Sequence, residues 1–283
     1  MFRSLKFAGA KLSNAGEHLK RGVLSLVWPE TSPSYRNKGV FTLSFFAKQS
    51  IPRPFTIRLA KAQDDPHILH FIRENFYCQE PLLKSLKVTK TMANPCLESR
   101  LCDNLKDGFT MIAVENKDNR IVGVALNQRN CIWDGDLLKD KADSVKCDPL
   151  RKLFYIWSIV STEPKLHQKY NTDCIFEIAI LATAREAQGQ GIGYQLTVHS
   201  LNLARDLGFE VARMDCTSEY SSRLAQRAGM ECIWSVPYKH LVDNAKNPVV
   251  KPEVPHTHIR VHATQLKPAA PTTTTTTPTK GST

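Results

Sequence analysis

The clearest hydrophobic pattern in this chain is an apolar strand that leads through a glycine-rich turn into an amphipathic helix. Residues 177–184 are almost continuously apolar, and glycines follow at positions 189, 191 and 193. Apolar residues then recur at helical spacing, at Leu196, Leu201, Leu203 and Ala204. This pattern predicts a buried strand, a tight turn and a helix from about Gly191 to Leu207.

Weaker patterns predict the elements on either side of this unit. Before it we expect a strand at Phe55–Ala62 and a helix at Asp64–Phe76. A hairpin of two strands follows at Phe109–Val114 and Ile121–Leu126, and a long helical segment at Asp134–Lys169. After it we expect a strand at 211–215, a helix at 218–227 and two final strands. Strands mixed with helices around one sheet indicate an α/β fold, and one domain over residues 53–267 accounts for these elements.

The glycine-rich turn has the chemistry of an anion site. Glycines let the backbone approach a ligand closely, and the free N–H groups and positive dipole end of a following helix face an anion. The dinucleotide pattern G-x-G-x-x-G fails, because its third glycine position is Leu196 or Tyr194. The G-x-x-x-x-G-K pattern fails too, since no Lys-Ser or Lys-Thr follows. We therefore expect another phosphorylated ligand, with a tight turn that binds nothing as the alternative.

The spacing Gln188-x-x-Gly191-x-Gly193 resembles the (Arg/Gln)-x-x-Gly-x-(Gly/Ala) loop of the GNAT acetyltransferase superfamily, which cradles the pyrophosphate of acetyl-coenzyme A. Further segments follow the same order, at Asn75–Leu82, Tyr170–Ile178 and Asp215–Ser222. Over about residues 55–266 the chain resembles the invertebrate arylalkylamine N-acetyltransferases, whose pattern includes Phe-x-x-(Asp/Glu)-Glu-Pro-Leu. The resemblance implies a single GNAT domain, with a mixed central sheet and helices on both faces.

The same resemblance implies acetyl-CoA as co-substrate and no metal. The cofactor-binding residues it implies come from the strand end and the loop, at Leu181, Ala182, Thr183, Gln188, Gly189, Gln190, Gly191, Ile192 and Gly193. Two positions depart from the family pattern. Gln79 stands where an acidic residue often precedes the glutamate, which leaves substrate choice open, and Gln188 stands where close relatives usually carry Arg, which removes one charge from the pyrophosphate site.

Acetyl transfer to an amine needs a general base, because arylalkylamines are largely protonated at neutral pH. Glu80 is the best candidate, since it follows an apolar helix and precedes Pro81-Leu82, where partial burial would raise its pKa. The resemblance aligns it with the family's catalytic glutamate. A solvated or capping glutamate at a helix end is the alternative reading.

The developing oxyanion and the departing thiolate need donors. Backbone N–H groups around Leu181–Thr183 can serve the oxyanion. By resemblance, the hydroxyls of Thr217, Ser221 and Ser222 lie in the right region for the thiolate, with Ser221 as first choice; helix capping is the alternative for each. Cys78 and Cys216 also fall in these segments, but no fixed His activates either one, so we expect direct transfer in a ternary complex.

These features indicate an acetyl-CoA-dependent N-acetyltransferase for an arylalkylamine of the dopamine, serotonin, tryptamine or octopamine type. A polyamine site should display extra carboxylates near Glu80, yet residues 77–79 and 81–82 are uncharged. A GNAT enzyme for another amine or a longer acyl-CoA, and a silent acyl-CoA-binding module, remain as alternatives.

The net charge of +11 comes from the ends of the chain. Residues 1–53 carry nine Lys/Arg and two Asp/Glu, residues 246–283 carry five and one, and residues 54–245 carry 24 of each. A neutral central region argues against a nucleic-acid groove. The apolar stretch at 22–28 is too short to span a bilayer, which needs ~20 residues. We expect small-molecule partners only, without nucleic acid or membrane, and a monomeric chain.

The eight cysteines form no C-x-x-C pair, which favours free thiols in a reducing compartment and a cytoplasmic location. Residues 1–52 are expected to form a disordered basic extension; a mitochondrial transit peptide is the alternative, because the first 46 residues are poor in acids. Residues 268–283, rich in Thr and Pro, are expected to be a disordered tail. His256, His258 and His262 would share one strand face, which we interpret as a solvated edge rather than a metal site.

Overall fold

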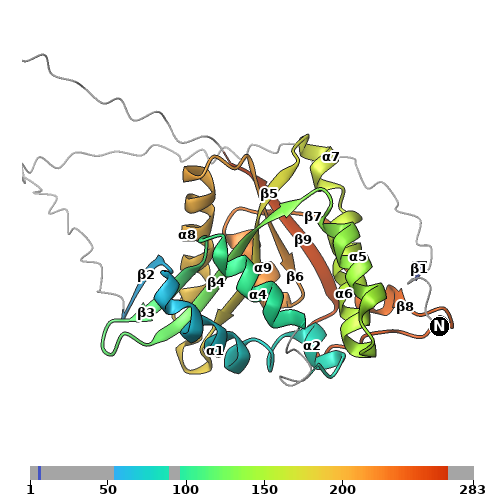
Figure 1. The fold of residues 1–283 in the computed structure, drawn as a ribbon, viewed down its shortest axis with the longest axis horizontal. Coiled ribbons are helices and arrows are strands. Elements are labelled where there is room, and N and C mark those ends of the chain that lie inside the picture. The colour runs from blue at the N-terminus through green and yellow to red at the C-terminus, as the bar shows by residue number, and fades with distance from the viewer. Residues whose placement is uncertain (1–5, 8–53, 89–95, 267–283) are drawn as a thin grey trace, which may run out of the picture. The chain divides into compact units, whose positions relative to one another are not determined.

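A seven-stranded sheet organises the computed structural model, which describes residues 6–7, 54–88 and 96–266 (Figure 1). The strands, in their order across the sheet, are β2 (Phe55–Leu59), β3 (Met111–Glu115), β4 (Ile121–Cys131), β5 (Cys174–Thr183), β6 (Val211–Cys216), β9 (His258–Gln265) and β7 (Glu231–Pro237). Neighbours are antiparallel except β5 and β6, which are parallel. Two-residue strands β1 (Lys6–Phe7) and β8 (Leu241–Val242) form a separate pair.

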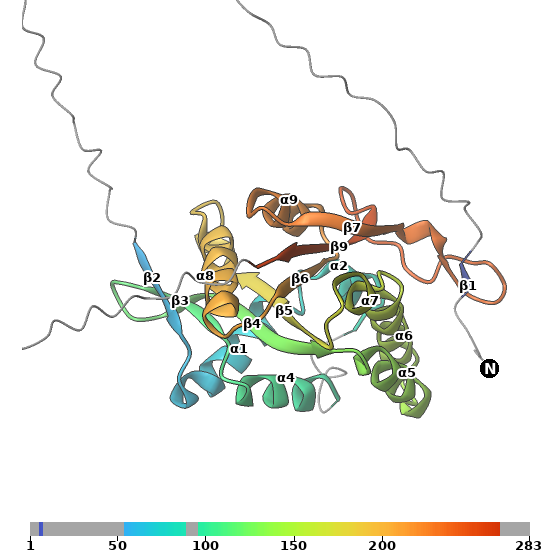
Figure 2. The same ribbon diagram turned by 90° about the horizontal axis from the view of Figure 1, so that it is seen from above.

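Helices cover both faces of the sheet, as predicted. They are α1 (Asp65–Asn75), α2 (Pro81–Ser85), α4 (Cys96–Lys106), α5 (Asp134–Ser144), α6 (Asp148–Thr162), α7 (Leu166–Tyr170), α8 (Ile192–Asp206) and α9 (Glu219–Arg227). Figure 2 shows α8 and α9 on one face and α1, α4, α5 and α6 on the other. Short 3-10 turns occur at Ala62–Asp64, Arg185–Ala187 and Tyr238–His240.

The strand, turn and helix read first in the sequence are present: α8 agrees with the prediction to one residue at each end, and β5 begins three residues before the apolar run 177–184. The predicted helical segment Asp134–Lys169 is divided into α5, α6 and α7. Pro149 explains the start of α6, because it lies in the first turn, where its missing N–H costs no helical hydrogen bond. The pattern missed α2, which is five residues long, and α4.

Strands β5 and β6 separate partway along their length. Their pairing runs from Phe176–Ala212 to Ile178–Met214 and stops there. On its other edge β5 stays paired with β4 as far as Thr183, which faces Gly123. The backbone of residues 179–183 therefore has one edge without a strand partner.

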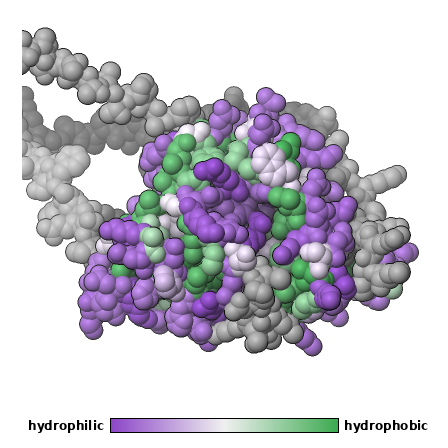
Figure 3. All heavy atoms as spheres, in the orientation of Figure 1, coloured by the Kyte–Doolittle hydropathy of each residue, from purple (hydrophilic) through white to green (hydrophobic). Residues whose placement is uncertain are grey.

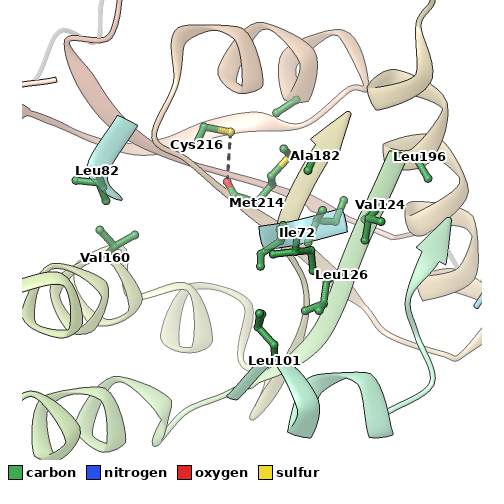
Figure 4. Close-up of a cluster of buried hydrophobic side chains, with 14 of the residues drawn as sticks. Ile72, Leu82, Leu101, Val124, Leu126, Val160, Ala182, Leu196, Met214 and Cys216 are labelled. Atoms are coloured by element: carbon green, nitrogen blue, oxygen red, sulfur yellow. Dashed lines mark hydrogen bonds between the residues drawn. The ribbon is translucent and has the colours of Figure 1, made fainter. Parts of the chain in front are cut away.

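Apolar side chains fix the helices against the sheet (Figure 4). Leu196 of α8 packs close to β4, where Gly123 leaves room: a Cβ at that position would lie 2.6 Å from Ile192 Cγ2. Leu82 of α2 faces Val160 of α6, and both are buried. Each such side chain contributes roughly 1.5–3 kcal/mol on burial, so the start of α8 and the position of α2 are well determined.

Strand β9 is an interior strand of the sheet, which corrects the prediction of a solvated histidine edge. β9 lies between β6 and β7, and His262 is fully buried. The prediction failed because the last strand in sequence is inserted between two earlier ones. Among the described residues, no group of His, Cys, Asp or Glu is arranged to hold a metal ion.

None of the described helices is both long and apolar enough to cross a bilayer. The extension predicted for residues 1–52, apart from Lys6 and Phe7, and the tail predicted for 268–283 lie outside the described residues.

Candidate active site

A cavity of about 770 Å³ extends along β5. Residues 177–183 of β5 line it, together with the segment that joins α1 to α2, parts of α4 and α6, and the starts of α8 and α9. In Figure 3 this face of the molecule is hollowed, and hydrophilic residues lie inside the hollow. The volume is in the usual range for a small-molecule site.

One end of the cavity is formed by the start of α8. Gly189 and Gly191 have φ values of 81° and 78°, a left-handed conformation that glycine adopts without strain. Gly191 is the N-cap residue, and no side chain caps this helix. The first helical hydrogen bond runs from the Gln195 N–H to the Gly191 carbonyl oxygen, at 3.0 Å. The N–H groups of residues 192–194 have no partner within the helix, as an anion site requires.

The loop residues differ in what they contribute to this end. Gln188, Gly189, Gly191, Ile192 and Gly193 line the cavity, whereas Gln190 does not. A Cβ at Gly193 would lie 3.0 Å from Leu224 Cδ1 of α9, so glycine at this position lets the Leu224 side chain pack closely against the start of α8. The bare backbone at Gly193 suits a pyrophosphate.

The divergence of β5 from β6 gives the cavity a backbone wall. Leu181, Ala182 and Thr183 line the cavity, on the stretch of β5 that β6 leaves unpaired. Donors fixed in a strand are oriented before any ligand binds. The geometry suits both sequence-based roles of these residues, contact with the cofactor and support of an oxyanion.

Glu80 lies beside this wall as the N-cap residue of α2. Its Oε2 accepts a hydrogen bond from the Leu83 N–H at 2.6 Å, and its Oε1 is buried without a hydrogen-bond partner among the described residues. Burial raises the pKa of Glu80, while the Leu83 N–H and the neighbouring Thr217 hydroxyl oppose the rise. Glu80 therefore caps a helix and also presents a free oxygen, so the two readings of the sequence are compatible.

The predicted hydroxyls lie in different places. Thr217 and Ser221 line the cavity, and the Tyr238 hydroxyl donates to the Thr217 carbonyl oxygen at 2.5 Å. Ser221 Oγ lies 3.0 Å from the Ser218 carbonyl oxygen and 2.9 Å from Ser218 Oγ. Ser222 is buried outside the cavity lining, with its Oγ 3.4 Å from His262 Nε2, so we do not retain it as a candidate.

Neither Cys78 nor Cys216 is placed to act as a nucleophile. Cys216 is fully buried, and burial raises its pKa to about 12, which keeps the thiol protonated. Cys78 is exposed and does not line the cavity.

The two residues that depart from the family pattern contact each other. Gln188 Nε2 donates to Gln79 Oε1 at 3.2 Å, and both side chains lie at the cavity lining. A neutral hydrogen bond thus joins the loop before α8 to the residue before Glu80.

A polar floor at the other end of the cavity was missed by sequence reasoning. Its members are buried or half-buried and line the cavity, at Asn104, Gln128, Asn130 and Glu177. The available signal was a polar residue inside an otherwise apolar strand, as at Glu177, and the polar run 127–130 at the end of β4.

Beneath this floor a buried arginine joins three elements. Arg213 of β6 is fully buried and donates to both carboxylate oxygens of Asp215, at 2.7 and 2.8 Å. It also donates to Asn130 Oδ1 of β4 and to the Val160 carbonyl oxygen of α6. Each of the three guanidinium nitrogens thus donates to at least one protein acceptor.

The geometry can be compared with known proteins. No protein-family profile matches the chain. Arylalkylamine N-acetyltransferase 2 from Aedes aegypti matches with a TM-score of 0.71 and 25% identity, covering 75% of this chain and 99% of its own. The mosquito protein called arylalkylamine N-acetyltransferase like 5b matches with a TM-score of 0.70 and 19% identity. The match covers 75% of this chain and 100% of that one. The Drosophila melanogaster polyamine N-acetyltransferase, described as forming N-acetylagmatine, matches with a TM-score of 0.68 and 21% identity. The match covers 75% of this chain and 100% of that one. The chain has the fold of the GNAT acetyltransferases.

Proposed function

We propose that this chain is an N-acetyltransferase that moves an acetyl group from acetyl-CoA to the primary amine of a small molecule. The observation that carries the proposal is that three features line one cavity: the uncapped start of α8, the unpaired edge of β5 and the free oxygen of Glu80. The fold supports it, because the compared structures are acetyltransferases of amines.

Each part of the cavity has a role in this reaction. The N–H groups of residues 192–194 would hold the pyrophosphate of acetyl-CoA, which supplies the acetyl group. The edge of β5 at 181–183 would align the donor and offer N–H groups to the carbonyl oxygen as it gains charge. Glu80 Oε1 would accept the amine proton, directly or through one water. Ser221 or Thr217 would donate a hydrogen bond to the departing thiolate.

We propose an arylalkylamine as acceptor. The cavity walls carry aromatic and apolar side chains, with Phe76, Tyr77 and Trp157 among them, which suit an aromatic ring. Two compared structures are named for arylalkylamine acetylation and one for polyamine acetylation. An aliphatic polyamine is therefore the second candidate.

A thiol-release assay with purified protein, acetyl-CoA and either tryptamine or dopamine tests the proposal. Amine-dependent release of free CoA thiol is the expected result, with reactions lacking amine as the control for hydrolysis. Tight CoA binding without thiol release for tryptamine, dopamine or a polyamine would identify a silent binding module instead.

We also propose that the chain acts as a cytoplasmic monomer without nucleic-acid or membrane partners. The balanced charge of residues 54–245 supports the absence of a nucleic-acid groove. Mitochondrial import is the alternative, supported by the acid-poor N-terminal sequence.

A further inference from the structure

The cavity has two chemically different ends, because β5 runs along its length. All residues of β5 from Glu177 to Thr183 line the cavity, and a register shift against β4 between Leu126 and Asn127 puts Glu177 on the α4 side of the sheet and Thr183 on the α8 side. Six residues of strand span ~20 Å. The phosphate-binding start of α8 follows the Thr183 end, so a donor that enters there leaves the Glu177 end for the acceptor.

Glu177 is a buried carboxylate whose one hydrogen-bond partner among the described residues is neutral. Gln128 Nε2 donates to Glu177 Oε2 at 2.7 Å, and Asn104 Nδ2 in turn donates to Gln128 Oε1. Glu177 is only 8% exposed, and no described residue donates a hydrogen bond to its Oε1. Oε1 is not among the fully buried polar atoms that lack a partner, so it is open to the cavity and can accept a hydrogen bond from a ligand or from water.

The nearest buried cation does not fill this role. Arg213 lies on the neighbouring strand, directly across from Glu177 in register, yet its guanidinium donates to Asp215, Asn130 and the Val160 carbonyl. The Glu177 end of the cavity is thus left with acceptor capacity that faces the space for a ligand.

The cavity walls formed by α4, α5 and α6 are mostly apolar, with Arg100 of α4 and Ser161 of α6 as polar exceptions. The apolar side chains are those of Leu97, Leu101, Leu138, Trp157 and Val160. Such walls fit an aromatic ring or an aliphatic chain, whereas the floor fits a group that donates hydrogen bonds. A ligand that satisfies both has an apolar middle and a polar far end.

We propose that Glu177, held by Gln128, is a specificity-determining residue that accepts a hydrogen bond from the far end of the acceptor amine. This inference rests on the proposed acetyltransferase function and narrows it to amines with a distal donor group. Two kinds of acceptor share this chemistry: arylalkylamines with a ring hydroxyl, and aliphatic amines with a guanidinium or a second ammonium. Asn104 is a positioning residue, because it acts through Gln128.

Matched pairs of acceptors test the proposal by kcat/KM with saturating acetyl-CoA. Tyramine and phenethylamine differ by one hydroxyl, and agmatine and butylamine differ by the guanidinium group. We expect the wild-type chain to prefer the donor-bearing member of at least one pair by about 10- to 100-fold, the usual effect of one hydrogen bond to a charged group. In Glu177→Gln that preference should fall toward unity, mainly through KM. Glu231→Gln, an exposed carboxylate of β7 outside the cavity lining, is the control and should keep the wild-type preference.

The outcomes separate this inference from the function on which it rests. A preference confined to tyramine identifies a ring hydroxyl as the ligand, and one confined to agmatine identifies a cation. Equal use of both members of each pair by the wild type, or an unchanged preference in Glu177→Gln, would overturn the role of Glu177 while leaving the acetyltransferase function standing. Absence of turnover with all four amines and with tryptamine would instead count against the proposed function.

A second variant guards against a folding defect in Glu177→Gln. Asn104→Leu removes the hydrogen bond that orients Gln128 and keeps the carboxylate itself. We expect it to reduce the same preference by a smaller factor, and thermal unfolding of both variants shows whether the fold is intact. If Glu177→Gln does not fold, an unchanged preference in Asn104→Leu decides against the proposal.

Discussion

The side chain of Glu80 performs two tasks with its two oxygens. Oε2 accepts from the Leu83 N–H and holds the start of α2, so the carboxyl cannot rotate freely. Oε1 is buried at a fixed position in a residue that lines the cavity. A base fixed by a cap is oriented before substrate binds, which reduces the reorganisation that catalysis requires.

The first prediction concerns this base. Glu80→Gln keeps the shape of the side chain and should lower turnover by about 10²- to 10⁴-fold with CoA affinity intact. Because burial raises the pKa of Glu80, the wild-type rate should rise with pH through a value above that of an ordinary glutamate, and this acidic limb should be absent in the variant. Steady-state rates across pH check both results.

Glu253→Gln is the matched control. Glu253 is an exposed carboxylate in a loop, and it forms an ion pair with Lys84 of α2, the helix that Glu80 caps. This variant should leave turnover and the pH profile unchanged. If Glu80→Gln instead turned over at nearly the wild-type rate with its acidic limb preserved, another group would be the base.

At the scale of residues, the sequence identified side chains that belong to a local motif. Glu80 and Ser221 were proposed because they stand in recognisable segments, and both line the cavity. Ser222 does not line the cavity, because a helix rotates by about 100° per residue and turns this neighbour toward His262. Glu177 was missed because its partners Gln128 and Asn104 are far away in sequence, and only the sheet and α4 bring them together.

Among the elements, α8 is the one whose start is central to the proposed binding of CoA. A second prediction follows for Gly191→Val, which places a β-branched residue at a φ of 78° and a side chain against the pyrophosphate site. We expect CoA affinity to fall by at least about tenfold, as measured by calorimetry.

The far end of the same helix offers a control for backbone strain alone. Gly208 has a φ of 80° with open space around it, so Gly208→Ala introduces comparable strain away from the cavity. It should lower stability slightly and leave CoA affinity unchanged. Undiminished affinity in Gly191→Val would remove the loop from the binding site.

A third prediction concerns the buried hydrogen bonds by which Arg213 of β6 connects β4 and α6. Arg213→Met leaves Asp215 and the Val160 carbonyl without their buried partner, and should lower the free energy of unfolding by about 3–5 kcal/mol in urea denaturation. Adding Asp215→Leu removes the stranded charge and should recover part of the loss. A double variant no more stable than Arg213→Met would show that the pair is not the source of the effect.

Elements with a long and regular pattern were predictable, and short or inserted ones were not. The periodicity of α8 gave its bounds to within one or two residues. Helix α2 has too few residues to show a period, and Pro81 with the Glu80 cap defines it instead. The position of β9 inside the sheet depends on spatial order, which the order of strands in the sequence does not contain.

For the whole molecule, the fourth prediction is that residues 53–267 are sufficient for chemistry. Every residue that lines the cavity lies within this range. A truncated chain of residues 53–267 should fold and acetylate arylalkylamines at nearly the full rate in the thiol-release assay. A soluble but inactive truncated chain would mean that residues outside this range contribute to the site or to assembly.

The same truncation tests location in the cell. If residues 1–46 direct mitochondrial import, a fluorescent fusion of the shortened chain should stay in the cytoplasm while the full chain does not. An identical distribution of both would favour a plain basic extension.

The hydrogen bond between Gln79 and Gln188 also has a consequence for how the molecule responds to its medium. An ion pair at this exposed place would weaken as dissolved salt shortened the Debye length, whereas two amides carry no net charge to be screened. The bridge between the acceptor side and the donor side of the cavity should therefore be equally strong in dilute buffer and at high ionic strength. Salt should then act on donor binding through the phosphates of CoA itself, and leave this contact unchanged.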